Sequence, residues 1–171
     1  MDVTILQWIT DVLQSPFLTS LMRFITALGN MGIIWVLFAC YFWFVRKDRK
    51  TALALIAAVV LTWLFNDCVL KQIFQRPRPF ITHPQFPPLI TGPESSSFPS
   101  GHSATSFAAM AVLAVVGGKW KMTGILLAVL IAFSRVYLHV HYPTDVLAGS
   151  LVGLFIGSFL MVQIKKQKSK Q

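Results

Sequence analysis

The sequence predicts an all-α fold: a polytopic bundle of about five transmembrane helices, preceded by an N-terminal amphipathic helical segment. Of its 171 residues, 55% are hydrophobic and only 12% are charged, and the mean hydropathy is +0.65. A soluble domain of this size rarely carries so few charges, because its surface must stay hydrated. The apolar residues also fall into long blocks, and a helix needs about 20 mostly apolar residues to cross a bilayer core of roughly 30 Å. The basic residues gather between or after these blocks, as juxtamembrane charges do.

Residues 1–29 are predicted to form short helices that lie at the membrane interface. Residues 2–14 place apolar side chains on one helical face and polar side chains on the other, which is typical of an interfacial helix. Ser15 and Pro16 then supply the N-cap and the first-turn proline of a second short helix that ends near Gly29. A sixth span over residues 3–27 is the alternative. It is disfavoured because no basic residue would mark a cytoplasmic N-terminus.

Residues 30–164 are predicted to form the transmembrane core, and residues 165–171 a basic cytoplasmic tail. The spans are expected at about 30–45, 51–70, 101–118, 122–138 and 145–164. Residues 76–100, between the second and third spans, are rich in proline and serine. This connection cannot be helical throughout, so we expect it outside the hydrocarbon.

Basic residues in three clusters mark one side of this bundle as cytoplasmic. They are Arg46, Lys47, Arg49, Lys50, Lys119, Lys121, Lys165, Lys166, Lys168 and Lys170. Alternation of five spans puts all of them on the same side, so we expect a multi-pass protein of the cell membrane with a cytoplasmic C-terminus. This distribution accounts for the net charge of +9 without nucleic acid, which is not expected as a partner.

Three short stretches are expected on the opposite, extracytoplasmic side. They are Lys71 to Arg78-Pro79; then Pro99-Ser100-Gly101-His102; then Ser134-Arg135, followed after five residues by His141 and after three more by Asp145. Cations near membrane depth are costly and are usually functional. The convergence of lysine, arginine and histidine on one face therefore predicts an anion site.

The residue types in these stretches suit the binding of phosphate. Lys71 offers a point charge, and Arg78 and Arg135 offer planar forks of donors for phosphate oxygens. Ser100 and Gly101 stand where a helix begins, and the free backbone N–H groups of a helix N-terminus favour an anion.

Two histidines and a carboxylate are candidates for the reaction itself. Because His141 and Asp145 are four residues apart, the carboxylate can fix the tautomer of the ring and leave its other nitrogen free to attack phosphorus. His102, from another helix, can then protonate the departing oxygen. Cations and backbone amides would meet the charge of the transition state. No metal site is predicted, since no HExxH-like pair occurs, and no cofactor is expected.

Together these residues resemble the type 2 phosphatidic acid phosphatase superfamily. Its signature is a lysine separated by six residues from Arg-Pro, then Pro-Ser-Gly-His, then Ser-Arg, five residues, His, three residues and Asp. The chain meets this signature at every position between Lys71 and Asp145. The resemblance implies a membrane phosphatase that passes through a phosphohistidine on His141, with His102 as acid and Asp145 orienting His141. It also implies that Lys71, Arg78, Ser100, Gly101 and Arg135 hold the phosphate.

A lipid phosphate is the expected substrate, because a lipid can enter a helix bundle sideways. The short chain looks like the compact bacterial members of the family. Undecaprenyl diphosphate is therefore the first candidate substrate, followed by phosphatidylglycerol phosphate and phosphatidate. Membrane lipids surround the bundle, and no obligatory protein partner is indicated. A soluble vanadate haloperoxidase shares the signature, but five apolar spans argue against it. A non-enzymatic lipid-binding protein would be expected to have lost His102, His141 or Asp145.

Several neighbouring residues are interpreted as structural. His139 has Pro143 rather than a carboxylate four residues on, so it is the weaker candidate nucleophile. His83 and Arg76 are interpreted as solvated loop residues; the alternatives are substrate contact for His83 and contact with lipid head groups for Arg76. Asn66 and Asp67 are interpreted as polar anchors that orient Lys71. Three glycines at steps of four, Gly149, Gly153 and Gly157, predict close packing of the last helix on a neighbour within the bundle.

Overall fold

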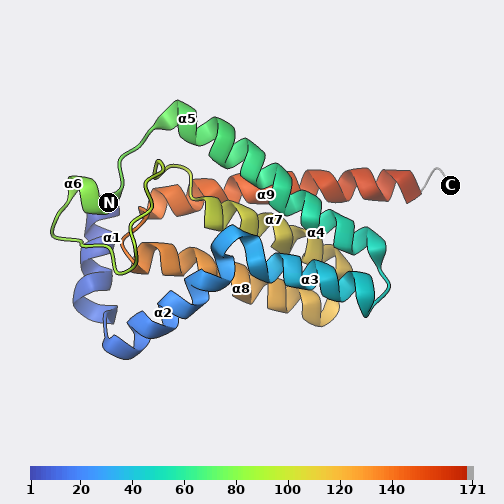
Figure 1. Ribbon diagram of the computed structural model, residues 1–171, viewed down its shortest axis with the longest axis horizontal. Helices are drawn as coiled ribbons and strands as arrows, with labels where there is room; N and C mark the ends of the chain where they lie inside the picture. Colours follow the sequence, from blue (N-terminus) through green and yellow to red (C-terminus); the bar gives the residue numbers. More distant parts are fainter. Residues whose placement is uncertain (169–171) are drawn as a thin grey trace.

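The computed structural model describes residues 1–168, and every regular element in that range is helical (Figure 1). The α-helices are α1 (Asp2–Trp8), α2 (Pro16–Gly29), α3 (Ile33–Phe44), α4 (Arg49–Thr62), α5 (Lys71–Phe74), α6 (Pro79–Thr82), α7 (Gly101–Val116), α8 (Gly118–Tyr137) and α9 (Pro143–Lys168). π-Helical segments extend α1 over Ile9–Leu13 and join α4 to α5 over Trp63–Leu70, and a 3₁₀ turn, Asn30–Gly32, joins α2 to α3. The predicted tail, residues 165–171, ends outside the described residues.

Local sequence explains where several helices begin. The hydroxyl of Ser15 accepts a hydrogen bond from the backbone N–H of Leu18 at 3.3 Å, and Pro16 occupies the first turn of α2, which confirms the predicted cap. The carboxylate of Asp48 accepts from the N–H of Thr51 at 3.1 Å and starts α4 in the same way.

Within the described residues, four segments are long and apolar enough to cross a membrane: Pro16–Phe44, Arg49–Thr82, Gly118–Tyr137 and Pro143–Val162. Three of them contain the predicted span 51–70 and most of the predicted spans 122–138 and 145–164. The predicted span 101–118 is the shorter apolar helix Gly101–Val116. The predicted span 30–45 is part of a longer segment, because α2 and α3 follow one another across a kink at Met31 and Gly32, where φ is 50° and 70°.

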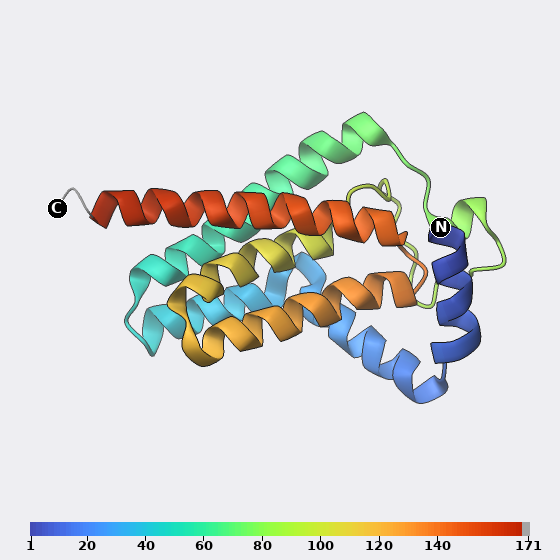
Figure 2. The same cartoon turned by 180° about the vertical axis from the view of Figure 1, so that it is seen from behind.

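α7 is the central helix of the bundle and packs against α4, α8 and α9. Figures 1 and 2 show α9 lying along it. A Cβ atom added to Gly149, Gly153 or Gly157 would collide with the backbone oxygen of Ser100, Ala104 or Ala108, respectively. The predicted close packing of the glycine stripe is therefore confirmed, with α7 as the partner.

The two ends of the bundle carry different connections between the helices. The α3–α4 connection, the α7–α8 turn and the C-terminal end of α9 lie at one end, as the alternation of spans predicts (Figure 1). The opposite end carries α6, the loop that leads to α7, and the α8–α9 loop. α1 lies crosswise over this end, so the N-terminus is beside these loops (Figures 1 and 2).

Candidate active site

The bundle brings six of the eight predicted site residues to the wall of one cavity of about 450 Å³: Lys71, Arg78, Gly101, His102, Arg135 and His141. These residues come from α5, the start of α6, the start of α7, the last turn of α8 and the α8–α9 loop. Ser100 and Asp145 lie behind the wall and are fully buried. The rest of the wall is mostly apolar and includes Val59, Val60 and Trp63. Val60 and Trp63 are 46% and 56% exposed, so this wall reaches the outer surface of the helices.

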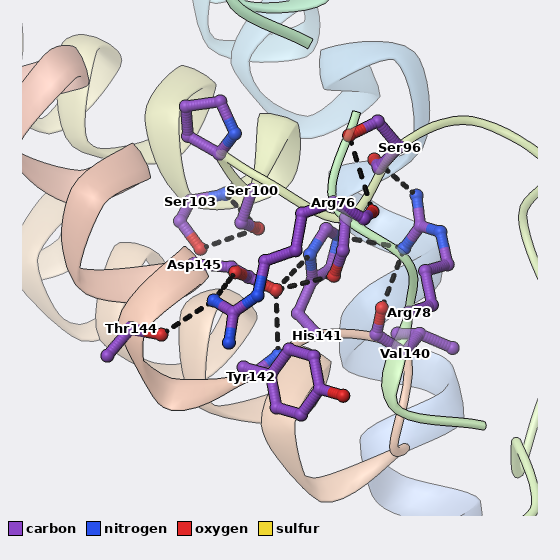
Figure 3. Close-up of polar contacts among 12 residues, drawn as sticks. Arg76, Arg78, Ser96, Ser100, Ser103, Val140, His141, Tyr142, Thr144 and Asp145 are labelled. Carbon is purple, nitrogen blue, oxygen red and sulfur yellow. Dashed lines mark hydrogen bonds and ion pairs between the residues drawn. The ribbon is translucent and has the colours of Figure 1, made fainter. Parts of the chain in front are cut away.

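Arg78 is 2% exposed and is held mainly by the main chain. Its Nε donates to the carbonyl of Ser95 at 2.7 Å, and its Nη1 donates to the carbonyl of Val140 at 2.6 Å. The same Nη1 lies 3.2 Å from Nε2 of His141 (Figure 3). A guanidinium has no acceptor, so Nε2 must present its lone pair, and a neutral His141 carries its proton on Nδ1.

His141 stands outside the candidate spans, in the loop between α8 and α9, with its side chain 2% exposed. Burial, followed by the positive charges of Arg135, Arg78 and Lys71, holds the pKa of His141 well below its ordinary value of 6.5. The ring is therefore neutral near pH 7, with its lone pair on Nε2.

Asp145 faces His141 without a hydrogen bond between them. Oδ2 of Asp145 lies 3.6 Å from Nδ1 of His141, and this nitrogen has no hydrogen-bond partner among residues 1–168. Oδ2 instead accepts from the hydroxyl of Ser97 at 2.5 Å and from the backbone N–H of Tyr142 at 2.9 Å. The Tyr142 bond is one half of a capping box, so Asp145 also helps to start α9.

Arg135 is 3% exposed and has few partners for its donors. Its Nη1 donates to the hydroxyl of Thr26 at 2.7 Å, and its Nε has no partner in the described part of the chain. Within residues 1–168 neither Arg135 nor Arg78 forms an ion pair with a carboxylate. Buried cations are normally paired, so two buried guanidinium groups without an ion pair indicate a place for an anion at the polar end of the cavity.

Lys71 differs from these arginines because it forms an ion pair. Its Nζ lies 2.5 Å from Oδ1 of Asp67, whose side chain is 27% exposed. Asp67 also borders Gly101: a Cβ atom added there would lie 2.9 Å from Oδ2 of Asp67. The interpretation of Asp67 as a polar anchor for Lys71 thus has direct geometric support. Asn66 contacts Asp67 at 3.4 Å and donates to the carbonyl of Pro99 at 3.3 Å.

At the start of α7, Ser100 has a structural role, whereas Gly101 and His102 line the cavity. The hydroxyl of Ser100 accepts from the N–H and the hydroxyl of Ser103, so it serves as the N-cap of the helix. His102 lines the cavity, and its Nε2 lies 3.0 Å from Oδ1 of Asn30 at the α2–α3 kink. Gly29 leaves room for this ring, because a Cβ atom there would lie 2.7 Å from its Cδ2.

The two remaining histidines do not line this cavity. Nε2 of His139 lies 3.0 Å from the side-chain polar atoms of Thr10 and Gln14, near the N-terminus. Burial lowers the pKa of His139, against a smaller opposing contribution from the carbonyl of Pro87. Nδ1 of His83 lies 2.8 Å from the hydroxyl of Thr82, in the loop.

Three groups at the site were missed by the sequence interpretation. Arg76, expected to be solvated, donates from Nη1 to Oδ1 of Asp145 at 2.5 Å (Figure 3). The serine run 95–97 has the composition of a linker, but the carbonyl of Ser95 accepts from Arg78 and the hydroxyl of Ser97 donates to Asp145. Asn30 follows an apolar helix and has no neighbouring motif. Of these three groups, Arg76 could have been identified from the sequence, because it lies between Lys71 and Arg78 of the signature.

A second cavity of about 400 Å³ adjoins the first and shares Asp67, Lys71, Arg78 and Ser95 with it. Polar side chains such as Gln72 and Glu94 complete its wall. Among the described residues, no group of three or more His, Cys, Asp or Glu side chains is arranged to hold a metal ion.

Residues 51–169 match the family model of the PAP2 superfamily, which covers the whole predicted signature. The chain belongs to the PAP2 superfamily. It is 34% identical to an undecaprenyl-diphosphatase of Sulfolobus acidocaldarius over 154 residues, 89% of this chain and 73% of that protein. It is 35% identical to phosphatidylglycerophosphatase B of Bacillus subtilis over 175 aligned positions, 94% of this chain and 81% of that protein.

A solved structure gives the same result for the fold. The crystal structure of a transmembrane PAP2-type phosphatidylglycerolphosphate phosphatase from Bacillus subtilis superposes with a TM-score of 0.79 at 30% identity. The match covers 96% of this chain and 85% of that chain. The predicted family and the predicted all-α membrane bundle are therefore confirmed, and this PAP2 protein is an integral membrane lipid phosphatase.

Proposed function

We propose that this PAP2 protein hydrolyses a lipid phosphate or diphosphate at the extracytoplasmic face through a phosphohistidine on His141, with undecaprenyl diphosphate as the first candidate substrate. The observation that carries the proposal is the pair of buried guanidinium groups, Arg78 and Arg135, neither of which forms an ion pair with a carboxylate within residues 1–168. They stand beside His141 and His102 on one cavity wall. An anion with several oxygens would supply the acceptors that these donors lack.

The reaction begins with attack by Nε2 of His141 on phosphorus. As the new N–P bond forms, the bond from phosphorus to the lipid oxygen, or to the bridging oxygen of a diphosphate, breaks, and its electron pair goes to the leaving oxygen. His102, in its protonated form, donates a proton to that oxygen. Water then attacks phosphorus of the phosphohistidine while neutral His102 takes up one of its protons; the P–N bond breaks, its electron pair returns to Nε2 of His141, and phosphate is released.

The cations meet the charge that develops during both steps. Arg78 lies within 3.2 Å of the attacking nitrogen, and Nε of Arg135 has no hydrogen-bond partner among the described residues. Lys71 and the backbone N–H of Gly101 complete the proposed set around the phosphate oxygens. Ser100 supports Gly101 by capping α7. Because these groups supply positive charge, the proposed mechanism uses no metal.

The shape of the cavity supports a lipid. Its apolar wall of Val59, Val60 and Trp63 leads from the outer surface of the helices to the cationic end. An acyl or prenyl chain can lie along this wall while the phosphate reaches His141. The charge distribution of the sequence supports an extracytoplasmic site, and the position of α1 beside that site supports an interfacial role for the first helical segment, residues 2–14.

The choice of lipid rests on two relatives of nearly equal identity. One is named undecaprenyl-diphosphatase and the other phosphatidylglycerophosphatase B. Undecaprenyl diphosphate is placed first because a carrier lipid exposes its diphosphate on the outer face. Phosphatidylglycerol phosphate and phosphatidate are the alternatives at the same site.

The test is phosphate release by purified protein in detergent with EDTA present, from each of these three lipids. His141→Ala should abolish release, whereas His83→Ala, a loop variant away from the cavity, should retain it. With ³²P-labelled lipid, label on the wild-type protein should survive alkali and be lost in acid, as a phosphohistidine is. Equal activity of His141→Ala and wild type would remove His141 from its role, and relative rates would rank the substrates.

A further inference from the structure

Arg76 occupies one of the unspecified positions of the PAP2 signature, between Lys71 and Arg78, yet its guanidinium is among the most connected groups at the site. Nη1 donates to Oδ1 of Asp145 at 2.5 Å and to the hydroxyl of Thr144 at 2.8 Å. Nη2 donates to Oδ2 of Asp2 at 2.9 Å. The guanidinium carbon also stands 4.1 Å from the centre of the Tyr142 ring. Figure 3 shows Arg76 reaching across to Asp145 and Thr144 from a segment distant in sequence.

Asp2, on the N-terminal helix, belongs to the same hydrogen-bond network. Besides Arg76, its carboxylate accepts from the backbone N–H of Thr144 at 3.1 Å and from the hydroxyl of Thr144 at 2.6 Å. Burial alone would raise the pKa of Asp2, but the hydrogen bonds from Thr144 and Arg76 outweigh burial and lower it. One guanidinium therefore bridges two carboxylates, one on the N-terminal helix and one in the first turn of α9.

This bridge fixes the carboxylate of Asp145 at both oxygens. Oδ1 is held by Arg76, and Oδ2 is held by Ser97 and the N–H of Tyr142. Asp145 is completely buried while these donors are in place. The 3.6 Å separation between Oδ2 and Nδ1 of His141 is consequently set by groups other than His141. Loss of Arg76 would free Oδ1 and allow the carboxylate plane to turn.

The N-terminal helix is attached to the catalytic loop at a second point as well. Thr10 and Gln14 contact His139, two residues before His141. The segment from Asp2 to Gln14 thus contacts the start of α9 through Asp2 and the α8–α9 loop through Thr10 and Gln14. The apolar side chains of Val3, Trp8 and Val12 remain exposed on this segment.

We propose that Arg76 is a positioning residue for the pair His141–Asp145, and that Asp2 positions Arg76 in turn. The N-terminal helix is then part of the catalytic apparatus. This inference rests on the proposed role of His141. It adds two residues, 74 positions apart in sequence, that hold the partner of the nucleophile without touching the phosphate.

The test compares Arg76→Gln, Arg76→Lys and Asp2→Asn with wild type, using the full chain in detergent and the lipid that wild type hydrolyses fastest. Asp2→Asn keeps an oxygen for Thr144 but removes the charge that faces Arg76. Arg76→Lys keeps the charge at Asp145 but cannot bridge both carboxylates. The matched control is Asp11→Asn, which removes a carboxylate from the same N-terminal segment, where it contacts only Gln7 among the hydrogen bonds of the described residues.

Arg76→Gln is expected to lower kcat about tenfold to a hundredfold, since small displacements of catalytic groups have effects of that size. KM and the inhibition constant of inorganic phosphate should stay within about twofold, because Arg76 does not line the first cavity. Arg76→Lys should recover part of kcat, and Asp2→Asn should lower it less than Arg76→Gln. Combining Asp2→Asn with Arg76→Gln should add little, because Asp2 acts through Arg76.

Three outcomes would overturn the inference. They are wild-type kcat in Arg76→Gln or Asp2→Asn, a loss of kcat that only follows a lower melting temperature, and a loss equal to that of Asp11→Asn. If Arg76→Gln does not fold, Arg76→Lys and Asp2→Asn decide the question. Activity of His141→Ala in the same assay would instead refute the proposed function. An inactive His141→Ala beside fully active Arg76 variants would refute only the inference.

Discussion

Oδ1 of Asp67 lies 2.5 Å from Nζ of Lys71, one helical turn along the same helix. The same carboxylate borders Gly101 and lines both cavities at their shared wall. A negative charge thus occupies the cationic end of the cavity, next to the place proposed for the substrate phosphate. It orients Lys71 and also competes with phosphate for it.

Asp67→Asn is therefore expected to tighten the binding of inorganic phosphate. Removing one partly exposed carboxylate from beside Lys71 corresponds to about 1 kcal/mol, or roughly fivefold in the inhibition constant. Phosphate inhibition of lipid hydrolysis measures this. Glu94→Gln, which lies only on the second cavity, is the control and should change little. Weaker inhibition in Asp67→Asn would show that orienting Lys71 outweighs the competition.

The buried position of His141 predicts how activity changes with pH. Attack requires the neutral ring, and burial with the charges of Arg135, Arg78 and Lys71 lowers the pKa of His141 well below 6.5. As pH falls, the neutral form therefore persists past the range in which a solvated histidine becomes protonated. The acid limb of kcat/KM, which reports the free enzyme, should have its midpoint below pH 6.5. A midpoint at or above that value, with a substrate that does not titrate there, would contradict the assignment.

The leaving group should reveal the role of His102. A lipid alkoxide needs a proton as it departs, whereas p-nitrophenolate does not, so His102→Ala should lose about 10²–10⁴-fold on a lipid monophosphate and much less on p-nitrophenyl phosphate. Asn30→Ala should show the same pattern to a smaller extent, because Oδ1 of Asn30 holds the His102 ring at 3.0 Å. Equal losses on both substrates would argue against general-acid catalysis by this ring.

The contact between α7 and α9 predicts a position with no room for a side chain. Gly153→Ala would drive a methyl group into the backbone of Ala104, and overpacking of this kind costs about 1–3 kcal/mol. Thermal unfolding in detergent should show a clearly lower melting temperature. Phe155→Leu, on a side chain of the same helix that is 73% exposed, should leave it nearly unchanged. An unaltered melting temperature in Gly153→Ala would mean that the two helices separate easily.

The sequence predicted the fold class and the candidate site because both depend on local patterns. Span length and charge alternation reveal the bundle. The signature residues are recognisable because each lies at a helix end with fixed spacing to its neighbours. The Ser15-Pro16 cap and the glycine stripe on α9 were predictable for the same reason.

Other features depend on contacts between distant segments, which no local pattern encodes. Arg76 looked like a solvated loop residue because both of its carboxylate partners lie far away in sequence. The run Ser95–Ser97 has the composition of a linker, but its carbonyls and hydroxyls satisfy Arg78 and Asp145. α2 ends at Gly29 as predicted, but the kinked junction that joins α2 and α3 into one apolar segment was not predicted, because Gly29 and Gly32 resemble complete breaks between helices.

The glycine contact between α7 and α9 bears on how the enzyme tolerates different bilayers. α7 begins beside His102 and α9 begins beside Asp145, and the backbone N–H of Ser100 donates to the carbonyl of Asp145 at 3.0 Å. These helices therefore form one rigid unit that carries parts of both halves of the site. When a thicker or thinner bilayer tilts the outer helices, this unit keeps its internal distances. We expect the spacing between the acid and the partner of the nucleophile to be insensitive to lipid chain length.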